Sequence, residues 1–434
     1  MPETVAYVLK GWPRISELFI ASEIYRLEQA GLKLRLYVIR PPDEAQTHPV
    51  VDRIAAEPVY LPATTSLSET TLFGWLRRNL RPFLPALRRT ARRHPRGLAQ
   101  ATGIALAQCV RARNGRFAWP RKLYVKELLQ AVALADELAG APDVRHLHAH
   151  FAHGTTTVTW LASTITGLPF SFTGHAKDIY SGSLNPAGLL RRKLLAASFA
   201  VTCTEANVGH LRSIAPEAVV HRVYHGLNAD FSRLMHDGDD TAAPAPNGLR
   251  LLGVGRLVAK KGFDVVVDAC GVLHRRGVPF EAVIVGPDDD AGPALRARIE
   301  ELGLGDHIRL EGQMSQAELF QEYRRASAFC LPCRILDNGD RDGIPNVLAE
   351  AMASGAPVVT TPISGIPEIV RDGVNGLLVQ PDDPEAVADA VLRLRTDPSL
   401  AESISQEARR TVRHEFDGER LAGTLQGLFR EAMA

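Results

Sequence analysis

The stretch Asp342-Gly-Ile-Pro-Asn-Val-Leu-Ala-Glu350-Ala-Met-Ala-Ser-Gly355 predicts a loop that leads directly into a buried helix. Pro345 suits the first helical position, where its missing N–H costs nothing. Gly355 suits the position just past the helix end, and Pro357 prevents continuation. Most residues between these ends are apolar or small, and Glu350 is the only charge, so we expect the helix to be mostly buried.

The same stretch combines two carboxylates with hydrogen-bond donors. Asp342 precedes the helix and Glu350 lies within it, while the N–H groups of Gly343, Ile344 and Asn346 are expected to be free at the helix start. Carboxylates accept hydrogen bonds from hydroxyls, and a helix start favours an anion. The stretch therefore suits a polyhydroxylated ligand with an anionic group. A core helix with one solvated Glu is the alternative that this chemistry leaves open.

Length and composition are those of a globular protein of two or three domains, with 434 residues and 45% hydrophobic side chains. No run approaches the roughly 20 apolar residues of a membrane span. The N-terminus predicts a first strand, because no basic region precedes an apolar run as in a signal peptide. The five cysteines are scattered and odd in number, which favours a reducing cytoplasm over a disulfide framework. The lone C-x-x-C pair, Cys330 and Cys333, is expected to be buried at a strand end.

Charge is unevenly distributed, although the net charge is only +1. Neither Asp nor Glu occurs from Thr70 to Lys126, and the segment is rich in arginine, especially in the stretch Arg77–Arg96. Large apolar residues such as Trp75 and Phe83 are mixed with these arginines. That mixture indicates a surface in contact with anionic membrane lipids, with a solvated basic surface as the alternative. Nothing else resembles a nucleic-acid-binding module, so nucleic acid is not an expected partner.

Short β-rich runs alternate with helical patterns in both halves of the chain, as in parallel α/β sheets. Acidic, small and Pro-rich residues at 237–248 predict a linker. We expect a Rossmann-like domain at 1–236, with a basic insertion at about 66–126, and a second Rossmann-like domain at 249–415. The expected strands are 4–9, 33–39, 59–61, 144–151, 169–173, 199–203 and 219–224 in the first domain, and 249–253, 280–285, 308–310, 328–331, 358–360 and 376–379 in the second. Residues 416–434 are expected to form a helix that packs back on the first domain.

Several polar residues fall at the carboxyl ends of predicted strands, where open α/β sheets bind ligands. His150 and His175 follow neighbouring strands of the first domain, and Gly11 allows a backbone to approach an anion closely. Arg256 and Lys261 follow the first strand of the second domain. Two fixed positive charges there suit a diphosphate. Two solvated loop cations are the alternative.

Two acidic clusters, Asp288–Asp290 and Asp337–Asp340, could hold a divalent cation beside a nucleotide. Neither has the spacing of a calcium loop, and both follow strands as polar turns, so we predict no metal. The chain has no Walker loop, which argues against ATP hydrolysis. No G-x-G-x-x-G follows the first strand, which argues against a dehydrogenase.

Together these motifs resemble glycosyltransferase family 4, the retaining nucleotide-sugar enzymes of GT-B fold. The resemblance covers most of the chain and is strongest in the second half. It rests on Gly255-Arg256-Leu-(x3)-Lys261-Gly262-Phe263-Asp264, on Asp342-Gly343-(x6)-Glu350-Ala351-Met352-Ala353-(x)-Gly355-(x)-Pro357-Val358-Val359, on Gly365-Ile-Pro-Glu368 and on Asn375-Gly376-Leu-Leu-Val379. Pro13-(x2)-Ser16-Glu17-(x)-Phe19-Ile20 and Thr173-Gly-His175-Ala-Lys-Asp178-Ile179-Tyr180 are similar to the branch that builds exopolysaccharides such as colanic acid.

The resemblance implies two facing domains with a cleft between them, and it implies roles for individual residues. Arg256 and Lys261 would hold the donor diphosphate, and Glu350 would accept hydrogen bonds from the ribose. Asp342 would contact the transferred sugar, but the family usually has Glu at this position, so the donor sugar stays open. The implied catalytic set is Asp342, His150, His175, Arg256 and Lys261. The implied donor-binding set is Gly11, Arg256, Lys261, Asp342, Gly343, Ile344, Pro345, Asn346 and Glu350, with His150 or His175 on the acceptor side.

The implied activity is retaining hexosyl transfer from a UDP- or GDP-linked sugar to a lipid-linked or polysaccharide acceptor, without a metal or other cofactor. The expected location is the cytoplasm, at the inner face of the cell membrane. An idle nucleotide-sugar-binding subunit that partners an active transferase is the main alternative, and Asp342 is the feature that favours it. A GT-B epimerase or phosphorylase is a third interpretation, although no Lys for pyridoxal phosphate can be placed.

Overall fold

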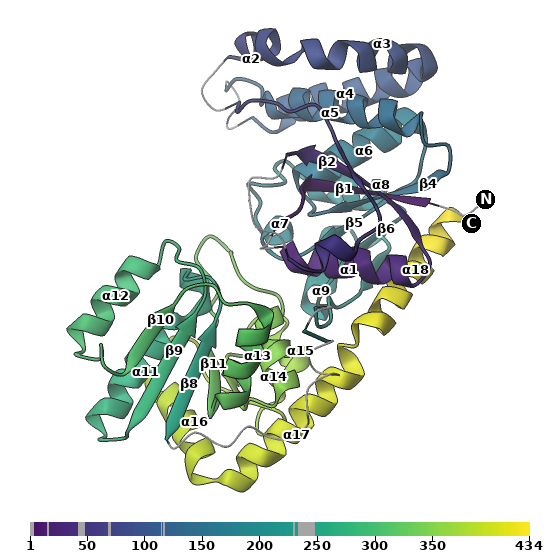
Figure 1. Cartoon of the computed structure of the whole chain (residues 1–434). Helices are drawn as coiled ribbons and strands as arrows, with labels where there is room; N and C mark the ends of the chain where they lie inside the picture. Colours follow the sequence, from purple (N-terminus) through teal and green to yellow (C-terminus); the bar gives the residue numbers. More distant parts are fainter. Residues whose placement is uncertain are drawn as a thin grey trace. The chain divides into compact units, whose positions relative to one another are not determined.

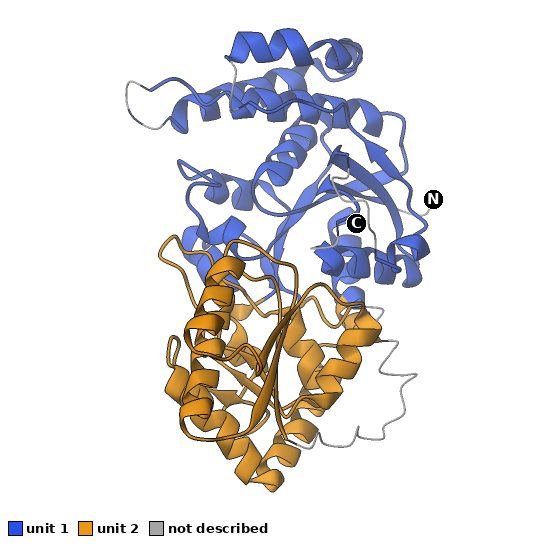
Figure 2. Cartoon of the chain, turned by 60° about the vertical axis from the view of Figure 1, so that its left-hand side comes forward, with its two compact units in different colours: residues 1–203, 207–223, 422–434 blue, residues 204–206, 224–421 orange. Residues whose placement is uncertain are grey.

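A computed structural model gives the structure of the chain. It describes residues 4–14, 17–41, 48–67, 71–113, 115, 118–228, 231–232 and 248–434. These residues form two compact units, coloured separately in Figure 2. Unit 1 contains residues 1–203, 207–223 and 422–434, and unit 2 contains residues 204–206 and 224–421. The predicted linker, apart from Gly248, lies outside the described residues.

Unit 1 is built on a seven-stranded sheet with the order β3-β2-β1-β4-β5-β6-β7. Its strands are β1 (Thr4–Gly11), β2 (Lys33–Arg40), β3 (Pro58–Tyr60), β4 (Val144–His150), β5 (Phe170–Gly174), β6 (Phe199–Thr202) and β7 (Val220–Arg222). Every neighbouring pair is parallel, as predicted. Because the strands are parallel, the ends of β1, β2 and β4 meet at one edge of the sheet.

Helices cover this sheet. They are α1 (Leu18–Gln29), α2 (Leu72–Asn79), α3 (Leu84–Arg93), α4 (Pro95–Arg111), α5 (Leu123–Leu138), α6 (Gly154–Thr166), α7 (Lys177–Tyr180), α8 (Leu189–Ala196) and α9 (Glu205–Ile214), with short 3-10 turns at η2 (Val51–Arg53) and η3 (Arg81–Phe83). The basic insertion forms α2 to α4. In it, α3 and α4 pack on α5, and α4 also packs on α6 (Figure 1).

Burial divides the large apolar residues of the insertion, which were predicted to share a lipid-facing surface with the arginines; the membrane contact itself stays a prediction. Trp75 and Phe83 are fully buried and belong to the core of unit 1. Phe73 is the large apolar residue of α2 that stays outside, with 80% of its surface exposed. Trp75 and Phe83 therefore serve packing, while the outer face of the segment carries arginines together with exposed apolar residues such as Phe73 and Trp119.

Unit 2 is built on a six-stranded sheet with the order β10-β9-β8-β11-β12-β13, again parallel throughout. Its strands are β8 (Leu249–Val254), β9 (Phe280–Val285), β10 (Ile308–Glu311), β11 (Ala328–Leu331), β12 (Val358–Thr360) and β13 (Leu377–Leu378). Its helices are η4 (Ala259–Lys261), α11 (Phe263–Arg275), α12 (Gly292–Glu301), α13 (Gln316–Arg325), α14 (Asn346–Ser354), α15 (Ile366–Ile369), α16 (Pro384–Thr396) and α17 (Pro398–Glu415). The predicted pair of parallel α/β sheets is confirmed.

The helix that was predicted from the opening stretch is α14. It begins at Asn346, so Pro345 is the residue before the helix and not its first residue. Gly355 ends it with φ of 84°, and a Cβ there would lie 2.1 Å from a guanidinium nitrogen of Arg409. The left-handed backbone conformation therefore favours glycine, while the Arg409 guanidinium, at the end of a flexible side chain, could move aside.

The last helix, α18 (Gly418–Met433), packs on unit 1 from Ala422 onward. Its Phe429 ring lies 5.0 Å from the His148 ring and 6.1 Å from the Tyr7 ring, measured between centroids. Gln426 Nε2 donates to the carbonyl of Ala30 over 2.8 Å. The predicted return of the C-terminal helix to the first domain is confirmed.

Candidate functional site

The candidate site in unit 2 lies on the loops that follow β8 and β11, which are neighbouring strands. The first loop runs from Gly255 through η4 to Gly262, and the second runs from Pro332 to Pro345. At Gly262, φ is 71° and a Cβ would lie 2.0 Å from the carbonyl oxygen of Pro332. The two loops touch at this point, so only glycine fits and their polar side chains are held close together.

Lys261 and Asp342 meet across these loops. Lys261 Nζ lies 2.8 Å from Asp342 Oδ2, and Lys260 Nζ lies 3.2 Å from Asp342 Oδ1. Lys260 also reaches Asp340 Oδ1 over 3.2 Å. The side chains of Lys261 and Asp342 are only 13% and 18% exposed. The cluster therefore contains two ammonium groups and two carboxylates, and its charges balance.

Electrostatics keep this cluster ionised. Burial would raise the pKa of Asp342, but the ammonium groups of Lys261 and Lys260 outweigh burial and lower the pKa to about 2. Burial alone would lower the pKa of Lys261, yet the charge of Asp342 raises it. At neutral pH Asp342 is thus a carboxylate held in place by two cations. A diphosphate that binds here competes with Asp342 for Lys261.

Arg256 lies on the same loop but outside the cluster. Its side chain is 53% exposed, and its Nη1 lies 3.1 Å from Asp289 Oδ2. Its positive charge acts on Lys261 and opposes the increase in the Lys261 pKa. Arg256 and Lys261 thus lie on the same loop, although Arg256 has no contact with Asp342 among the described residues, and their joint contact with a diphosphate stays a prediction.

Glu350 points into the interior of unit 2. Its Oε1 accepts a 2.7 Å hydrogen bond from Asn228, and its Oε2 accepts a 3.1 Å hydrogen bond from the Tyr323 hydroxyl. Burial raises the pKa of Glu350 to about 7, although both hydrogen bonds oppose the increase. Asn228 Oδ1 in turn accepts from the amide of Phe231. Glu350 therefore fixes a chain segment within unit 2, and its contact with a ribose stays a prediction.

The start of α14 carries donors, as predicted. Among the described residues, the amides of Gly343 and Ile344 have no hydrogen-bond acceptor. No side chain caps the helix, and its first turn has no acidic residue. The positive end of the helix dipole and two free N–H groups thus lie beside Asp342.

His150 and His175 meet at the carboxyl edge of the sheet in unit 1, after β4 and β5. His150 Nδ1 lies 3.4 Å from His175 Nε2, and the rings stack with centroids 5.6 Å apart. The other nitrogen of His150 lies 3.0 Å from Glu23 Oε1, which also accepts from the Tyr7 hydroxyl. Both histidines are where the sequence predicts them, and their role stays a prediction, as does that of Gly11 at the end of β1.

Potential metal ligands converge at Glu23, His148 and His150, whose ligand atoms lie within 4.8 Å of one another. His148 is already hydrogen-bonded at both ring nitrogens, to Ser171 and Thr173. In the predicted acidic clusters, Asp288 pairs with Arg296, and Asp289 and Asp340 pair with Arg256 and Lys260. These groups therefore have partners in the protein, and a metal-free reaction stays a prediction.

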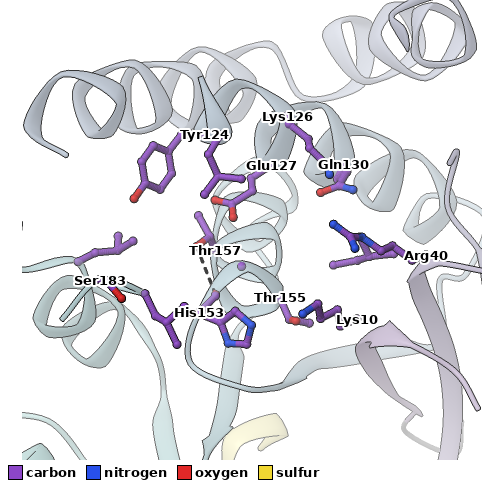
Figure 3. Close-up of a pocket in the computed structure, with 15 residues that line it drawn as sticks. Lys10, Arg40, Tyr124, Lys126, Glu127, Gln130, His153, Thr155, Thr157 and Ser183 are labelled. Carbon is purple, nitrogen blue, oxygen red and sulfur yellow. Dashed lines mark hydrogen bonds between the residues drawn. The ribbon is translucent and has the colours of Figure 1, made fainter. Parts of the chain in front are cut away.

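A cavity in unit 1 was missed by the sequence analysis. It has a volume of about 230 Å³ and is lined by Lys10, Arg40 and Lys126 among others. Figure 3 shows these three cations on the same side of the cavity, while Tyr124 and Ser183 lie on the opposite side. The sequence contains one indication of this cavity, a cation at the end of each of two strands: Lys10 precedes Gly11 in β1, and Arg40 ends β2.

Comparison with protein families identifies the second unit. Residues 248–397 match the family model described as Glycosyl transferases group 1. The amylovoran biosynthesis glycosyltransferase AmsK of Erwinia amylovora is 38% identical over 39% of this chain and 41% of its own length. The putative colanic acid biosynthesis glycosyltransferase WcaL of Salmonella typhimurium is 36% identical over 46% and 49%. A GDP-mannose-dependent phosphatidylinositol monomannoside mannosyltransferase of Mycobacterium tuberculosis is 33% identical over 41% and 46%. The chain spans less than half the length of each of these relatives.

Solved structures resemble the whole chain. Sucrose-phosphate synthase from Thermosynechococcus elongatus has a TM-score of 0.67 at 18% identity, and covers 99% of this chain and 98% of its own. Anabaena Alr3699/HepE in complex with UDP and glucose has a TM-score of 0.65 at 15% identity, over 99% and 100%. At this level of identity the likeness concerns the fold, and it confirms the predicted GT-B architecture.

Residues 248–397 thus form a glycosyl transferases group 1 domain, and the predicted resemblance to glycosyltransferases of the exopolysaccharide branch is confirmed. Among the described residues, no helix has both the length and the apolar character needed to cross a membrane.

Proposed function

We propose that this chain is a retaining glycosyltransferase that moves a sugar from a nucleoside diphosphate donor to a glycan or lipid-linked acceptor, without a metal ion. The observation that carries the proposal is the contact of Lys261 with Asp342, beside the free amides of Gly343 and Ile344, on strand-end loops of a glycosyl transferases group 1 domain. The group brings a cation, a carboxylate and a helix start to one place. In a sugar diphosphate, the cation and the helix start would contact the diphosphate, and the carboxylate would contact the sugar hydroxyls.

The leaving group is the first requirement of the reaction. As the bond between the anomeric carbon and the diphosphate oxygen breaks, negative charge accumulates on the diphosphate. Lys261 and Arg256 are the cations of this loop, and they would stabilise that charge more strongly in the transition state than in the bound donor. Fixed cations would thereby supply the positive charge that a divalent metal could otherwise provide.

Asp342 would orient the donor sugar. Its pKa of about 2 keeps it ionised, so it accepts hydrogen bonds from sugar hydroxyls at any physiological pH. The two lysines fix the position of this carboxylate before the donor arrives. When Lys261 moves to the diphosphate, Lys260 still holds Asp342, so the carboxylate keeps a partner during the reaction.

Retention follows if the acceptor approaches from the face that the diphosphate leaves. The acceptor oxygen forms the new bond to the anomeric carbon, and its proton passes to an oxygen of the departing diphosphate. No protein base is required in this step. UDP and GDP are the nucleotides supported by relatives, through the UDP complex of HepE and the GDP-mannose-dependent mannosyltransferase.

The test is product formation by the purified chain with a panel of UDP- and GDP-linked sugars and with lipid-linked and oligosaccharide acceptors, read by mass spectrometry. Transfer with retained anomeric configuration, unaffected by EDTA, is expected. Binding of a nucleotide sugar without transfer or slow hydrolysis would instead support the idle subunit, in which the carboxylate of Asp342 stays locked between the two lysines. Conversion of the sugar nucleotide without an acceptor would support an epimerase.

A further inference from the structure

The cavity in unit 1 lies at the carboxyl edge of the sheet. Lys10 comes from the end of β1 and Arg40 from the end of β2, and the register places Arg40 beside Gly11. Helix α5 contributes Lys126, Glu127 and Gln130, and the turn after β4 with the start of α6 contributes His153 and Thr155. With the segment that carries Ser183, Leu184 and Leu189, five chain segments far apart in the sequence build one pocket, and Figure 3 shows side chains around it.

Within the described part of the chain, the three cations of this cavity lack a direct ion pair. Among the described residues, Lys10, Arg40 and Lys126 form no ion pair with a carboxylate, whereas Lys261 in unit 2 pairs with Asp342 over 2.8 Å. Burial lowers the pKa of Lys10 and of Lys126, and the charge of Arg40 lowers both further, although Glu17 opposes the decrease at Lys10 and Glu127 opposes it at Lys126. Lys126 is only 6% exposed. Holding like charges together in this way is unfavourable unless an anion joins them.

Hydrogen-bonding atoms around the cavity are also without partners. Buried atoms that have none are Gln130 Nε2, Thr155 Oγ1, His153 Nδ1 and Glu127 Oε2. Gln130 and Thr155 are each 2% exposed. An unsatisfied buried polar group costs about 1–3 kcal/mol, so four around one cavity indicate that a ligand supplies the missing partners.

The start of α6 adds to this preference for an anion. The helix begins at Gly154, has no side-chain cap, and carries no acidic residue in its first turn. Lys193 holds the turn before it in place, because its buried Nζ donates to the carbonyl oxygens of Ala152 and His153 over 2.9 and 3.0 Å. The positive end of the helix dipole is thereby fixed at the cavity.

Glu127 is the one acidic residue of the lining, and it defines the rest of the ligand. Burial raises its pKa, and the ammonium group of Lys193 opposes that increase. A carboxyl group beside the cations repels a phosphate oxygen when ionised, but it accepts hydrogen bonds from hydroxyls. The hydroxyls of Tyr124 and Ser183 lie on the side of the cavity away from the cations (Figure 3). The cavity thus has a side for an anion and a side for a polyhydroxylated group.

We propose that this cavity binds the phosphoryl group of a phosphorylated acceptor, with Lys10, Arg40 and Lys126 on the phosphate oxygens and Gln130 and Thr155 as hydrogen-bond donors. The proposal rests on the proposed function, because it names the class of acceptor that the transferase uses. The sugar attached to the phosphate faces Glu127. The anion site itself is a property of unit 1 and does not require turnover.

The phosphate could belong to a lipid or to a soluble sugar phosphate, and the segment that leads into α5 favours a lipid. Leu123 lines the cavity and is exposed, and Trp119 shortly before it is 92% exposed. Arg121 and Lys122 lie between them in the sequence. Exposed tryptophan beside basic residues is typical of membrane interfaces.

Binding of sodium pyrophosphate, measured by isothermal titration calorimetry, tests the site. The titration uses full-length chain carrying Lys261→Met, which weakens the competing site in unit 2. On this background Lys10→Met/Lys126→Met keeps the aliphatic stems and removes two charges, and we expect the Kd to rise about 30-fold or more, from two lost charged hydrogen bonds. Lys33→Met is the matched control, at the other end of β2, and should leave the Kd unchanged. An unchanged Kd in the double variant overturns the proposal.

Thr155→Val keeps the proposal testable if the double variant does not fold. The substitution replaces an unpartnered buried hydroxyl by a methyl group, so the melting temperature should stay the same or rise. Pyrophosphate affinity should nevertheless fall about 5-fold, by the loss of one hydrogen bond. Unchanged affinity in a folded Thr155→Val chain contradicts the proposal.

Further titrations identify the source of the phosphate. Farnesyl diphosphate should bind more tightly than pyrophosphate and lose that advantage in Trp119→Ser if the acceptor is lipid-linked. Glucose 1-phosphate should bind more tightly than farnesyl diphosphate if the acceptor is a soluble sugar phosphate. If pyrophosphate binds through Lys10 and Lys126 but no sugar is transferred in the donor panel, the proposed function fails and the anion site stands. If transfer activity instead survives Lys10→Met/Lys126→Met unchanged, the proposed function stands and the cavity is not the acceptor site.

Discussion

Two groups of lysines lie at the carboxyl edges of the two sheets, and they differ in how their charge is balanced. In unit 2, Lys260 and Lys261 share Asp340 and Asp342, at distances of 2.8 to 3.2 Å. In unit 1, Lys10 and Lys126 lie beside Arg40 without a carboxylate partner among the described residues. The lysine charges are thus neutralised by carboxylates in unit 2, whereas in unit 1 the neighbouring cations repel one another.

This difference shows what each group is ready to do. A balanced cluster is stable without a ligand, so it can hold the geometry of a reacting site between turnovers. An unbalanced cluster gains stability when an anion arrives, so it favours binding over positioning. If the proposed function holds, we therefore expect catalysis at the cluster in unit 2 and capture of the acceptor in the cavity of unit 1.

The largest expected effect follows from Lys261→Met. Removing the ammonium group leaves the departing diphosphate with less compensation, and kcat should fall about 10²–10³-fold, as for the loss of one strong electrostatic contact. Asp342 loses its nearer cation and retains Lys260, so the free energy of unfolding should fall, but by less than in Asp342→Asn. Steady-state kinetics with the best donor, with Lys33→Met as the control, measure the effect. Retention of full activity would show that the balanced cluster is not catalytic.

A second prediction concerns Glu350, a buried acid of unit 2 whose partners are neutral. Its pKa is raised to about 7 from an ordinary value of 4.5. The folded state therefore binds the proton more tightly than the unfolded state. The resulting stability is complete below about pH 4.5 and is lost as the pH rises through about 7. Up to about 3 kcal/mol is involved.

Glu350→Gln separates this effect from ligand binding. The amide can still accept one hydrogen bond from Asn228 or Tyr323 but cannot titrate, so the slope of unfolding free energy between pH 4.5 and 7 should disappear. Urea denaturation at several pH values measures the slope. If the slope persists, another group is responsible. A large increase in the donor Kd with unchanged stability would instead favour the predicted contact with ribose.

The paired cluster could be anticipated from sequence because its residues belong to compact local motifs. The spacing from Gly255 to Gly262 and from Asp342 to Gly355 fixes both loops, and the parallel order of β8 and β11 brings them together. The pairing of Lys260 with Asp342 was not predicted, because the direction of neighbouring lysines on a short 3-10 turn depends on the opposite loop.

The cavity in unit 1 could not be predicted in the same way. Its cations come from the ends of β1 and β2 and from α5, and only the strand order and the packing of α5 bring them together. Glu350 gives the same lesson, since its partner Asn228 is 122 residues away in the sequence. The burial of Trp75 and Phe83 was not predicted either, because the basic composition of their segment does not indicate which residues face the core.

Asp342→Asn turns the balanced cluster into an unbalanced one and is the third prediction. The lowered pKa of Asp342 means that its ionised form stabilises the folded state above about pH 4, and that this contribution is lost as the pH falls through about 2. Losing the charge should therefore cost about 2 kcal/mol at neutral pH. The freed lysines should bind free UDP or GDP more tightly, while turnover falls. Calorimetry and denaturation on one preparation check both effects. Weaker nucleotide binding would contradict the competition between Asp342 and the diphosphate.

The smallest expected effect concerns the arginines of α3, which also differ in whether a carboxylate balances their charge. Arg89 Nη2 lies 2.5 Å from Asp136 Oδ2, and Arg93 Nη1 lies 3.6 Å from Asp136 Oδ1. Arg92 is exposed and, among the described residues, has no carboxylate partner. Arg92→Ser should therefore weaken binding to liposomes with anionic lipids about 5-fold, since one basic residue near such a surface contributes about 1 kcal/mol.

Arg89→Ser is the informative companion to that variant. It removes the same charge from the same helix, but it also breaks the contact with Asp136 that joins α3 to α5, so its main effect should be a lower melting temperature. Lys33→Ser controls for the loss of one positive charge elsewhere in unit 1. Equal liposome binding by the wild type and Arg92→Ser, at low ionic strength where surface electrostatics are strongest, would make α3 a solvated face. In that case Trp119 would be the residue left to bring the acceptor cavity to a lipid surface.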